Sequence, residues 1–255
     1  MSTTPFAPSS RLDSRNVVIA GGLGAVGKAT AARLAAIGAR IIVLHRKPDV
    51  EAKAFLESLP SGNHFAVKAS ITDSASLAQA AQEVASHVNA VHVLVNTAGF
   101  TKPVPAADLA GLTDEIIDSI FAANWRGVFA TIRAFYPLLA ASGDGLIVNV
   151  SSISATTGTG SNLAYVAAKA GVDILGKSLA RTLAPTVRVL TVSPGVVESA
   201  FVPGRGAEFN AKAAASTPLK RVGQPDDVAA AIEACATTLR FATGQTLVVD
   251  GGRAL

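Results

Sequence analysis

Cysteine is nearly absent from this chain of 255 residues, which has only one, Cys235. A single thiol forms no internal disulfide, so the chain suits a reducing compartment. We interpret Cys235 as a small apolar residue buried on a helix. Charged residues are also few, at 16%, whereas hydrophobic residues make up 49%. Such a chain can fill a sizeable interior, and disorder is not expected.

Long hydrophobic runs and clusters of like charge are scarce too. No apolar run is long enough to span a bilayer, and residues 1–15 form a polar tail without the apolar core of a signal peptide. The net charge is a mild +4, and the basic residues are scattered apart from His45–Lys47. We therefore expect a cytoplasmic protein that binds neither membranes nor nucleic acid and has no metal site. A mild positive field does suit a polyphosphate ligand.

Short apolar runs alternate with helical stretches along almost the whole chain. The runs lie at 17–20, 41–44, 65–67, 91–95, 146–150, 187–192 and 247–249, and the helical stretches at 28–37, 74–87, 114–139, 164–183 and 226–239. This alternation predicts a doubly wound α/β domain, a parallel sheet with helices on both faces. We expect a flexible tail over 1–15 and one domain over 16–255. The stretch 198–219 breaks the rhythm and is expected to form a substrate lid.

A glycine-rich turn joins the first strand to the first helix. In such a turn, backbone N–H groups can approach a pyrophosphate, and the N-terminus of the helix favours its charge. A glycine pattern alone is weak evidence, but here it stands between a strand and a helix, which is the required context. The expected contacts come from Gly21, Gly22, Leu23, Gly24, Val26 and Gly27.

The end of the second strand indicates which dinucleotide is bound. NAD-binding proteins place an acidic residue there to accept from the ribose hydroxyls. This chain has His45, Arg46 and Lys47 instead, which can pair with a 2′-phosphate. We therefore expect NADP(H) to be preferred, with NAD(H) possible. The alternative is that these are solvated surface charges.

Tyr165 and Lys169 lie four residues apart on an expected helix, so both side chains can reach one ligand. A phenol that titrates near pH ~10 is a poor proton donor and acceptor at neutrality. A nearby ammonium favours the phenolate and moves the pKa toward the working range. The pair is therefore a candidate acid–base group, although such a pair alone is more often ordinary helix surface.

With Ser152 thirteen residues before Tyr165, these motifs resemble the short-chain dehydrogenase/reductase family, over nearly everything after Asn16. The resemblance implies a role for each residue. Tyr165 gives a proton to a carbonyl oxygen or removes it from an alcohol, and Ser152 hydrogen-bonds the same oxygen. Lys169 holds the nicotinamide ribose and tunes Tyr165. Asn124 positions a water that relays protons to Lys169.

The resemblance also places further cofactor contacts and a substrate pocket. The cofactor contacts are Ser70, Ile71, Asn96, Ala98, Gly99, Pro194, Gly195, Val197 and Ser199, together with Tyr165 and Lys169. The pocket is expected between 100–104, 153–163 and 196–209. One departure concerns the glycine turn, where Ala25 stands at the family's middle glycine and its methyl would crowd the pyrophosphate unless Gly24 gives way.

The implied architecture is a Rossmann-type, seven-stranded parallel sheet in the order 3-2-1-4-5-6-7. The resemblance further implies a homotetramer in which the helices at 114–139 and 164–183 pack between subunits. Their many alanine and apolar residues suit close helix contact.

We predict an oxidoreductase that moves a hydride between NADP(H) and a small ketone or alcohol. The alternatives are a nucleotide-sensing regulator without catalysis, an NAD-preferring alcohol dehydrogenase, and epimerisation or dehydration on the same fold. A regulator would be expected to have lost Tyr165 or Lys169. The motifs resemble carrier-linked 3-oxoacyl reductases as well. Residues 139–145, however, have none of the cations that would meet an acidic carrier, which favours a free small molecule.

Overall fold

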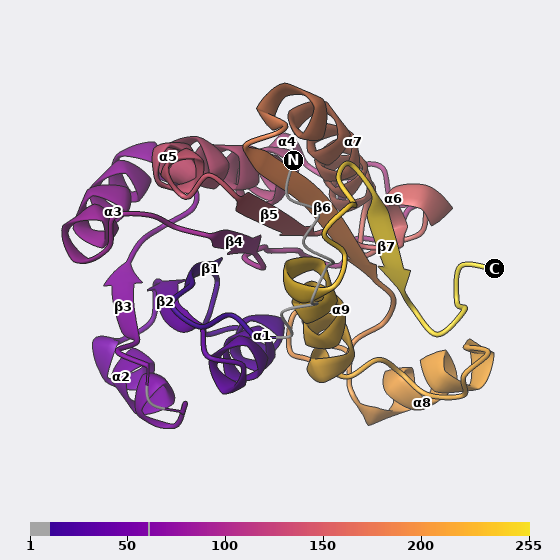
Figure 1. The fold of residues 1–255 in the computed structure, drawn as a ribbon. Helices are drawn as coiled ribbons and strands as arrows, with labels where there is room; N and C mark the ends of the chain where they lie inside the picture. Colours follow the sequence, from indigo (N-terminus) through magenta and orange to yellow (C-terminus); the bar gives the residue numbers. More distant parts are fainter. Residues whose placement is uncertain (1–10, 61) are drawn as a thin grey trace.

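The computed structural model describes residues 11–60 and 62–255. Its centre is a parallel sheet of seven strands in the order β3-β2-β1-β4-β5-β6-β7 (Figure 1). The strands are β1 (Asn16–Ala20), β2 (Arg40–His45), β3 (Phe65–Lys68), β4 (Val93–Asn96), β5 (Gly145–Val150), β6 (Val187–Pro194) and β7 (Thr246–Val249). The predicted fold class and strand order are confirmed.

Helices cover both faces of this sheet (Figure 1). They are α1 (Ala25–Ala36), α2 (Asp49–Glu57), α3 (Ser74–His87), α4 (Asp114–Phe121), α5 (Gly127–Ala141), α6 (Ser154–Thr157), α7 (Leu163–Leu183), α8 (Ala207–Ser216) and α9 (Pro225–Thr237), with a π-helical turn, η1 (Ala122–Arg126), between α4 and α5. Helices α3, α5 and α7 pack on one face, and α1 and α9 on the other.

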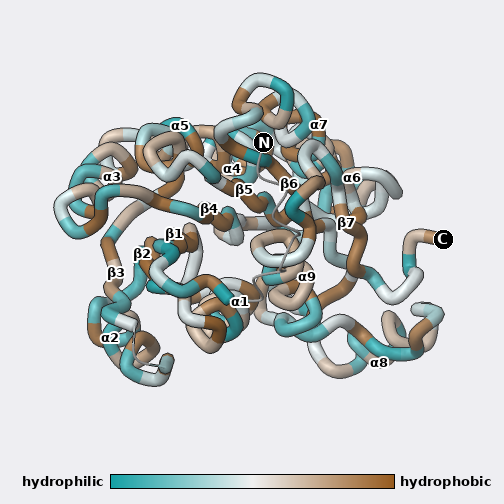
Figure 2. The backbone as a smooth tube through the Cα atoms, viewed as in Figure 1, coloured by the Kyte–Doolittle hydropathy of each residue, from teal (hydrophilic) through white to brown (hydrophobic). Residues whose placement is uncertain are grey.

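The core is two apolar layers, one on each face of the central strands. Successive strand residues point to opposite faces, so Val18 and Ile42 join the layer under α3, α5 and α7, whereas Val17 and Ile41 join the layer under α1 and α9. Figure 2 shows these strands as mostly hydrophobic segments inside mixed helices. Burial on both faces explains why the strand sequences lack alternation.

Three helices and one break escaped the sequence prediction. Helix α2 and helix α8 bury one residue each, Ala52 and Ala213, so neither has an apolar stripe to detect, and α6 is a single turn. The helix predicted over 114–139 is divided by the π-helical turn. Helical periodicity continues through such a turn, which hides it in the sequence.

The predicted flexible tail needs a correction at its inner end. Residues 1–10 lie outside the described part, but Leu12 is buried in the layer under α1 and its N–H donates to the carbonyl of Ile37. A single leucine in a polar segment forms no periodic pattern, so the sequence does not indicate that it is buried. Within the described residues, no helix is long and apolar enough to cross a membrane.

Candidate active site

A cavity of about 1340 Å³ opens where the carboxyl ends of β1, β4, β5 and β6 meet. In open parallel sheets, ligands bind at this edge because the loops that follow neighbouring strands converge there. The glycine-rich turn follows β1, the residues Ala98 and Gly99 follow β4, Ser152 follows β5 and Gly195 follows β6. The topology therefore brings the predicted motifs to one site.

The glycine-rich turn is shaped by close backbone approaches. Gly21 has a φ of +79°, and a Cβ there would lie 2.7 Å from the Cα of Ala98. A Cβ on Gly27 would lie 2.4 Å from the carbonyl oxygen of Gly21, so α1 can start this close to β1 only with glycine. Gly24 is the N-cap of α1 without a side-chain cap, which leaves the first N–H groups facing the cavity. Ala25 is exposed beside them.

Helix α7 presents Tyr165 and Lys169 to the same cavity. The side chain of Asn162 caps this helix by accepting from the Tyr165 N–H at 2.7 Å, which places the tyrosine in the first turn. The Lys169 Nζ donates to the carbonyl oxygen of Val150 at 2.7 Å and lies 5.6 Å from the centre of the Tyr165 ring. Both side chains are buried, as residues four apart on one helical face can be.

Ser152 lies at the end of β5, close to the phenol. Its Oγ donates to the Ser154 Oγ at 3.1 Å and accepts from the Ser154 N–H at 3.2 Å. A side-chain hydrogen bond between Ser152 and Tyr165 favours the phenolate. The neighbouring Ser151 is turned inward and donates to the backbone of Lys169 at 3.3 Å. Ser152, not Ser151, therefore stands next to the acid–base candidate.

Burial dominates the ionisation of both groups. It raises the pKa of Tyr165 to about 12, opposed by Ser152 and by the Arg205 guanidinium. It also lowers the pKa of Lys169 to about 8, opposed by Asp173. The expectation that Lys169 moves the Tyr165 pKa downward is not met in this structure, because burial is the largest cause and the Lys169 ammonium, which donates to the carbonyl oxygen of Val150, is not among the groups that lower that pKa. Burial thus favours the protonated phenol of Tyr165, the form that donates a proton.

Asn124 is fully buried in the π-helical turn η1. Its Nδ2 donates to the carbonyl oxygens of Phe100, at 2.6 Å, and Ile120, at 2.9 Å. Its side chain therefore ties this turn to the loop after β4 and does not line the cavity. A π-helical turn often marks a functional position. The water that Asn124 is expected to position stays a prediction.

Known proteins resemble the chain over nearly its whole length. The family model described as enoyl-(acyl carrier protein) reductase matches residues 22–254. A protein described as ketoacyl reductase 2 of the granaticin polyketide synthase of Streptomyces violaceoruber is 35% identical, over 92% of this chain and 94% of that protein. A short-chain type dehydrogenase/reductase of Sinorhizobium fredii is 35% identical, over 94% of this chain and 98% of the relative. The chain belongs to the short-chain dehydrogenase/reductase family.

This dehydrogenase/reductase also matches solved members of its family in shape. The crystal structure of a 3-oxoacyl-[acyl-carrier protein] reductase from Brucella melitensis superposes with a TM-score of 0.87 and 26% identity, over 100% of this chain and 98% of the other. The protein is accordingly an oxidoreductase acting on CH–OH and C=O groups, in a family that uses NAD(H) or NADP(H). The predicted resemblance is confirmed.

The cavity of this dehydrogenase/reductase fits a dinucleotide at the end near β2. Gly21, Gly24 and Gly27 line this end, and the close packing of the turn that Gly21 and Gly27 allow brings the N-terminus of α1 to the cavity, where it can face a pyrophosphate. Arg46 is exposed at the cavity wall and has no hydrogen-bond or ion-pair partner among the described residues. Lys47 is paired with Glu51 at 3.0 Å, and His45 is buried with its Nδ1 3.0 Å from the Lys47 carbonyl oxygen. Of these three residues, Arg46 is the one that the protein itself leaves without a polar partner among the described residues.

Most of the predicted cofactor contacts line this cavity. They are Gly21, Leu23, Gly24, Val26, Gly27, His45, Arg46, Lys47, Ile71, Ala98, Gly99, Tyr165, Lys169, Pro194, Gly195, Val197 and Ser199. Three predicted contacts lie outside it. Gly22 packs against Val43 of β2, the Ser70 hydroxyl meets Thr72 at 3.0 Å, and Asn96 donates to Asn149 of β5 at 2.9 Å. Gly22, Ser70 and Asn96 therefore support the residues of the cavity wall and do not line the cavity themselves.

The sequence reasoning missed the charged and aromatic side chains at the other end of the cavity. Phe201 lies over Tyr165, with ring centres 6.0 Å apart, and Arg205 and Arg253 line the wall beside it. Phe201 and Arg205 are predicted from the sequence only as members of the expected pocket segment 196–209. They lie in irregular segments, where no periodicity or motif indicates the direction of a side chain.

Proposed function

We propose that this protein is an NADP(H)-dependent reductase of small ketones, or the dehydrogenase of the corresponding alcohols. One observation carries the proposal: Tyr165, Ser152 and Lys169 meet at one end of a cavity whose other end is the glycine-rich turn. A carbonyl placed between Ser152 and Tyr165 would lie beside a nicotinamide held by the loops after β5 and β6.

The proton chemistry follows from the residues themselves. Tyr165, kept protonated by burial, donates its hydroxyl proton to the carbonyl oxygen. Ser152 donates a hydrogen bond to the same oxygen, where negative charge develops. Lys169 would bind the nicotinamide ribose and return a proton to Tyr165 through a water; because the Asn124 side chain is bonded to Phe100 and Ile120, Asn124 would hold that water through its backbone. The bound nicotinamide supplies the hydride.

The preference for NADP(H) is supported by Arg46. A free guanidinium at the end of β2 can clasp a 2′-phosphate with two parallel hydrogen bonds. Lys47 adds to the local positive field while its charge is shared with Glu51. We also propose that the stretch 198–219, which contains α8, is the substrate lid, because Phe201 already covers Tyr165.

Turnover of a panel of ketones and alcohols with NADPH, NADH and their oxidised forms tests the proposal. The absorbance of the reduced nicotinamide reports the reaction. We expect reduction of at least one class of ketone, with NADPH favoured. If the protein binds a dinucleotide tightly yet turns over none of the panel in either direction, the regulator without catalysis replaces the reductase.

A further inference from the structure

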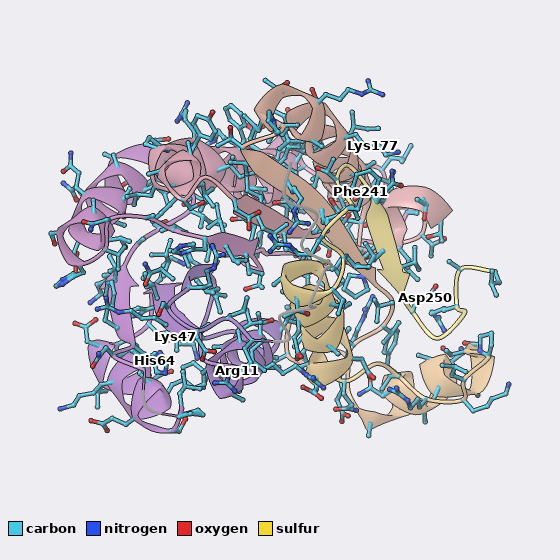
Figure 3. The ribbon with its side chains drawn as sticks, viewed as in Figure 1. Arg11, Lys47, His64, Lys177, Phe241 and Asp250 are labelled. Atoms are coloured by element: carbon cyan, nitrogen blue, oxygen red, sulfur yellow. The ribbon has the colours of Figure 1, made fainter. Side chains whose placement is uncertain are left out.

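The basic side chains that line the cavity have no acidic counterpart there. His45, Arg46, Lys47, Lys169, Arg205 and Arg253 line it, and among the residues that the structure describes neither aspartate nor glutamate does. These groups lie at two ends. The first three belong to β2 and the loop after it, whereas Arg205 and Arg253 come from the lid and the C-terminal segment. Figure 3 shows Lys47 near α1 and α2, on the opposite side of the molecule from Asp250.

Arg205 is the charged group of the lid that faces the reaction centre. Its guanidinium is half-buried, lies 4.4 Å from the centre of the Phe209 ring, and is near enough to Tyr165 to favour the phenolate. Within residues 11–60 and 62–255, its guanidinium has no hydrogen-bonding acceptor or carboxylate partner. A half-buried cation without a counter-ion is costly, and an anionic ligand removes that cost.

Arg253 holds a second positive charge beside the first. Its Nη1 donates to the carbonyl of Ala213 at 3.0 Å and to the hydroxyl of Ser216 at 2.8 Å, which fixes it against the C-terminal end of α8. The nearest acidic side chain in the sequence, that of Asp250, instead accepts from the N–H groups of Gly252 and Ala254. Two neighbouring guanidinium groups therefore repel each other, and burial and this repulsion both lower the pKa of Arg205.

We infer that Arg205 binds an anionic group of the substrate, and that the substrate class is a ketone bearing a carboxylate, an oxo acid, or the matching hydroxy acid. The inference rests on the proposed function and specifies its substrate class. The planar guanidinium matches a carboxylate with two hydrogen bonds. Phe201, Val202 and Phe209 line the same end and provide an apolar wall for the carbon chain between the two groups. The carbonyl oxygen of the substrate would then accept a hydrogen bond from Tyr165 while its carboxylate pairs with Arg205.

Paired substrates test the inference. 2-Oxo and 4-oxo acids of equal chain length, their methyl esters, and the neutral thioester of a 3-oxo acid are compared in the unmodified enzyme and in Arg205→Met. The unmodified enzyme is expected to prefer an acid over its ester. Arg205→Met should lower kcat/KM for the acid relative to that for the ester by roughly ten- to hundredfold, through KM, and leave KM for NADPH unchanged. Arg205→Lys should keep part of the preference, because it keeps the charge.

Lys212→Met is the matched control, since it removes a cation from the exposed side of α8 outside the cavity. It should change none of these values. Equal turnover of acid and ester by the unmodified enzyme would overturn the inference and leave the reductase intact, and a preference for the thioester would assign a carrier-linked substrate. An equal rise in KM for every substrate and for NADPH in Arg205→Met would show a structural or cofactor role instead.

Calorimetric titration of the oxo acids into the enzyme with NADP⁺ separates this inference from the proposed function. If no compound is turned over, the reductase fails, but weaker binding of the acid to Arg205→Met than to the unmodified protein still supports the anion site. Equal binding to both proteins rejects it.

Discussion

Tyr165 and Lys169 share one buried site and respond to it in opposite directions. Burial disfavours the charged form of each, which raises the pKa of the phenol to about 12 and lowers that of the ammonium to about 8. The phenol therefore stays protonated over the whole range in which enzymes are assayed. The charge of Lys169, in contrast, titrates within that range.

Tyr165→Phe removes only the hydroxyl that delivers the proton, so the fold and dinucleotide binding should persist. The rate should fall by at least ~10²–10⁴, the contribution expected of a general acid. Steady-state turnover checks this, with the dissociation constant of NADP⁺ as the control for folding. Ser152→Ala should lower the rate ~10²–10³-fold, because the hydrogen bond to the developing negative charge is lost. Near-normal turnover by Tyr165→Phe would mean that another group donates the proton.

The activity in ketone reduction should depend on pH through Lys169. Because its pKa in the fold is about 8, the ammonium is present below that pH and is lost as the pH rises through it. We expect kcat/KM to fall above pH about 8, whereas Tyr165, with a pKa of about 12, remains a donor. The Lys169→Arg variant keeps its charge at every accessible pH. We expect it to react more slowly, and its kcat/KM should not fall above pH ~8. A flat profile for the unmodified enzyme up to pH ~10 would contradict the assignment.

At the scale of elements, the proposed preference for NADP(H) rests on strand β2 and the segment after it. The strand ends at the buried His45, and the chain then turns outward so that Arg46 reaches the cavity wall while Lys47 pairs with Glu51 of α2. The sequence shows three basic residues in a row. Because of the direction in which the chain continues after β2, Arg46 alone of the three has no polar partner among the described residues.

Arg46→Ser should reduce the preference for NADP(H) over NAD(H) by roughly ten- to hundredfold, the value of one charge-assisted contact with a phosphate. The ratio of kcat/KM for the two cofactors measures it, and rising salt should shrink the ratio in the unmodified enzyme. Lys53→Ser, which removes a charge from the exposed face of α2, is the matched control. Equal kcat/KM values for the two cofactors in the unmodified enzyme would make Arg46 an ordinary surface charge.

At the scale of the whole molecule, apolar side chains remain uncovered along α7 and β7. Ile174 on α7 is 63% exposed and Val248 on the edge strand β7 is 55% exposed. Phe241, in the loop before β7, is fully exposed, and the same loop reaches α7, because a Cβ on Gly244 would lie 4.0 Å from the Cα of Lys177. Exposed apolar groups that lie on neighbouring elements are typical of subunit interfaces.

We predict a homotetramer, with α4, α5 and α7 packing between subunits and β7 at a second contact. Light scattering at micromolar concentration should give the mass of four chains. Ile174→Asp and Val248→Asp should each lower the measured mass, because a carboxylate in an apolar interface loses its water. A monomer in the unmodified protein would reject the oligomer and leave the fold unaffected.

Strand order, the glycine-rich turn and the Ser152–Tyr165–Lys169 group could be predicted from the sequence. The strands, the turn and the pairing of Tyr165 with Lys169 depend on local spacing: buried strands are apolar runs, the turn needs glycine where a Cβ would clash, and two residues four apart share a helix face. The strand order and the role of Ser152 were implied by the resemblance to the family. The topology of a parallel sheet then brings the carboxyl ends of the strands together without further information.

The tertiary structure alone decided the ionisation of the site and the direction of its remaining charges. The pKa of Tyr165 depends on how much water the fold removes around it, which no spacing in the chain expresses. Arg205 and Arg253 are far apart in sequence and lie in segments without periodicity, yet packing of the C-terminal segment against α8 brings them to the same wall. Local spacing thus determined which motifs the chain carries, and long-range packing determined how their side chains ionise and which other charges lie beside them.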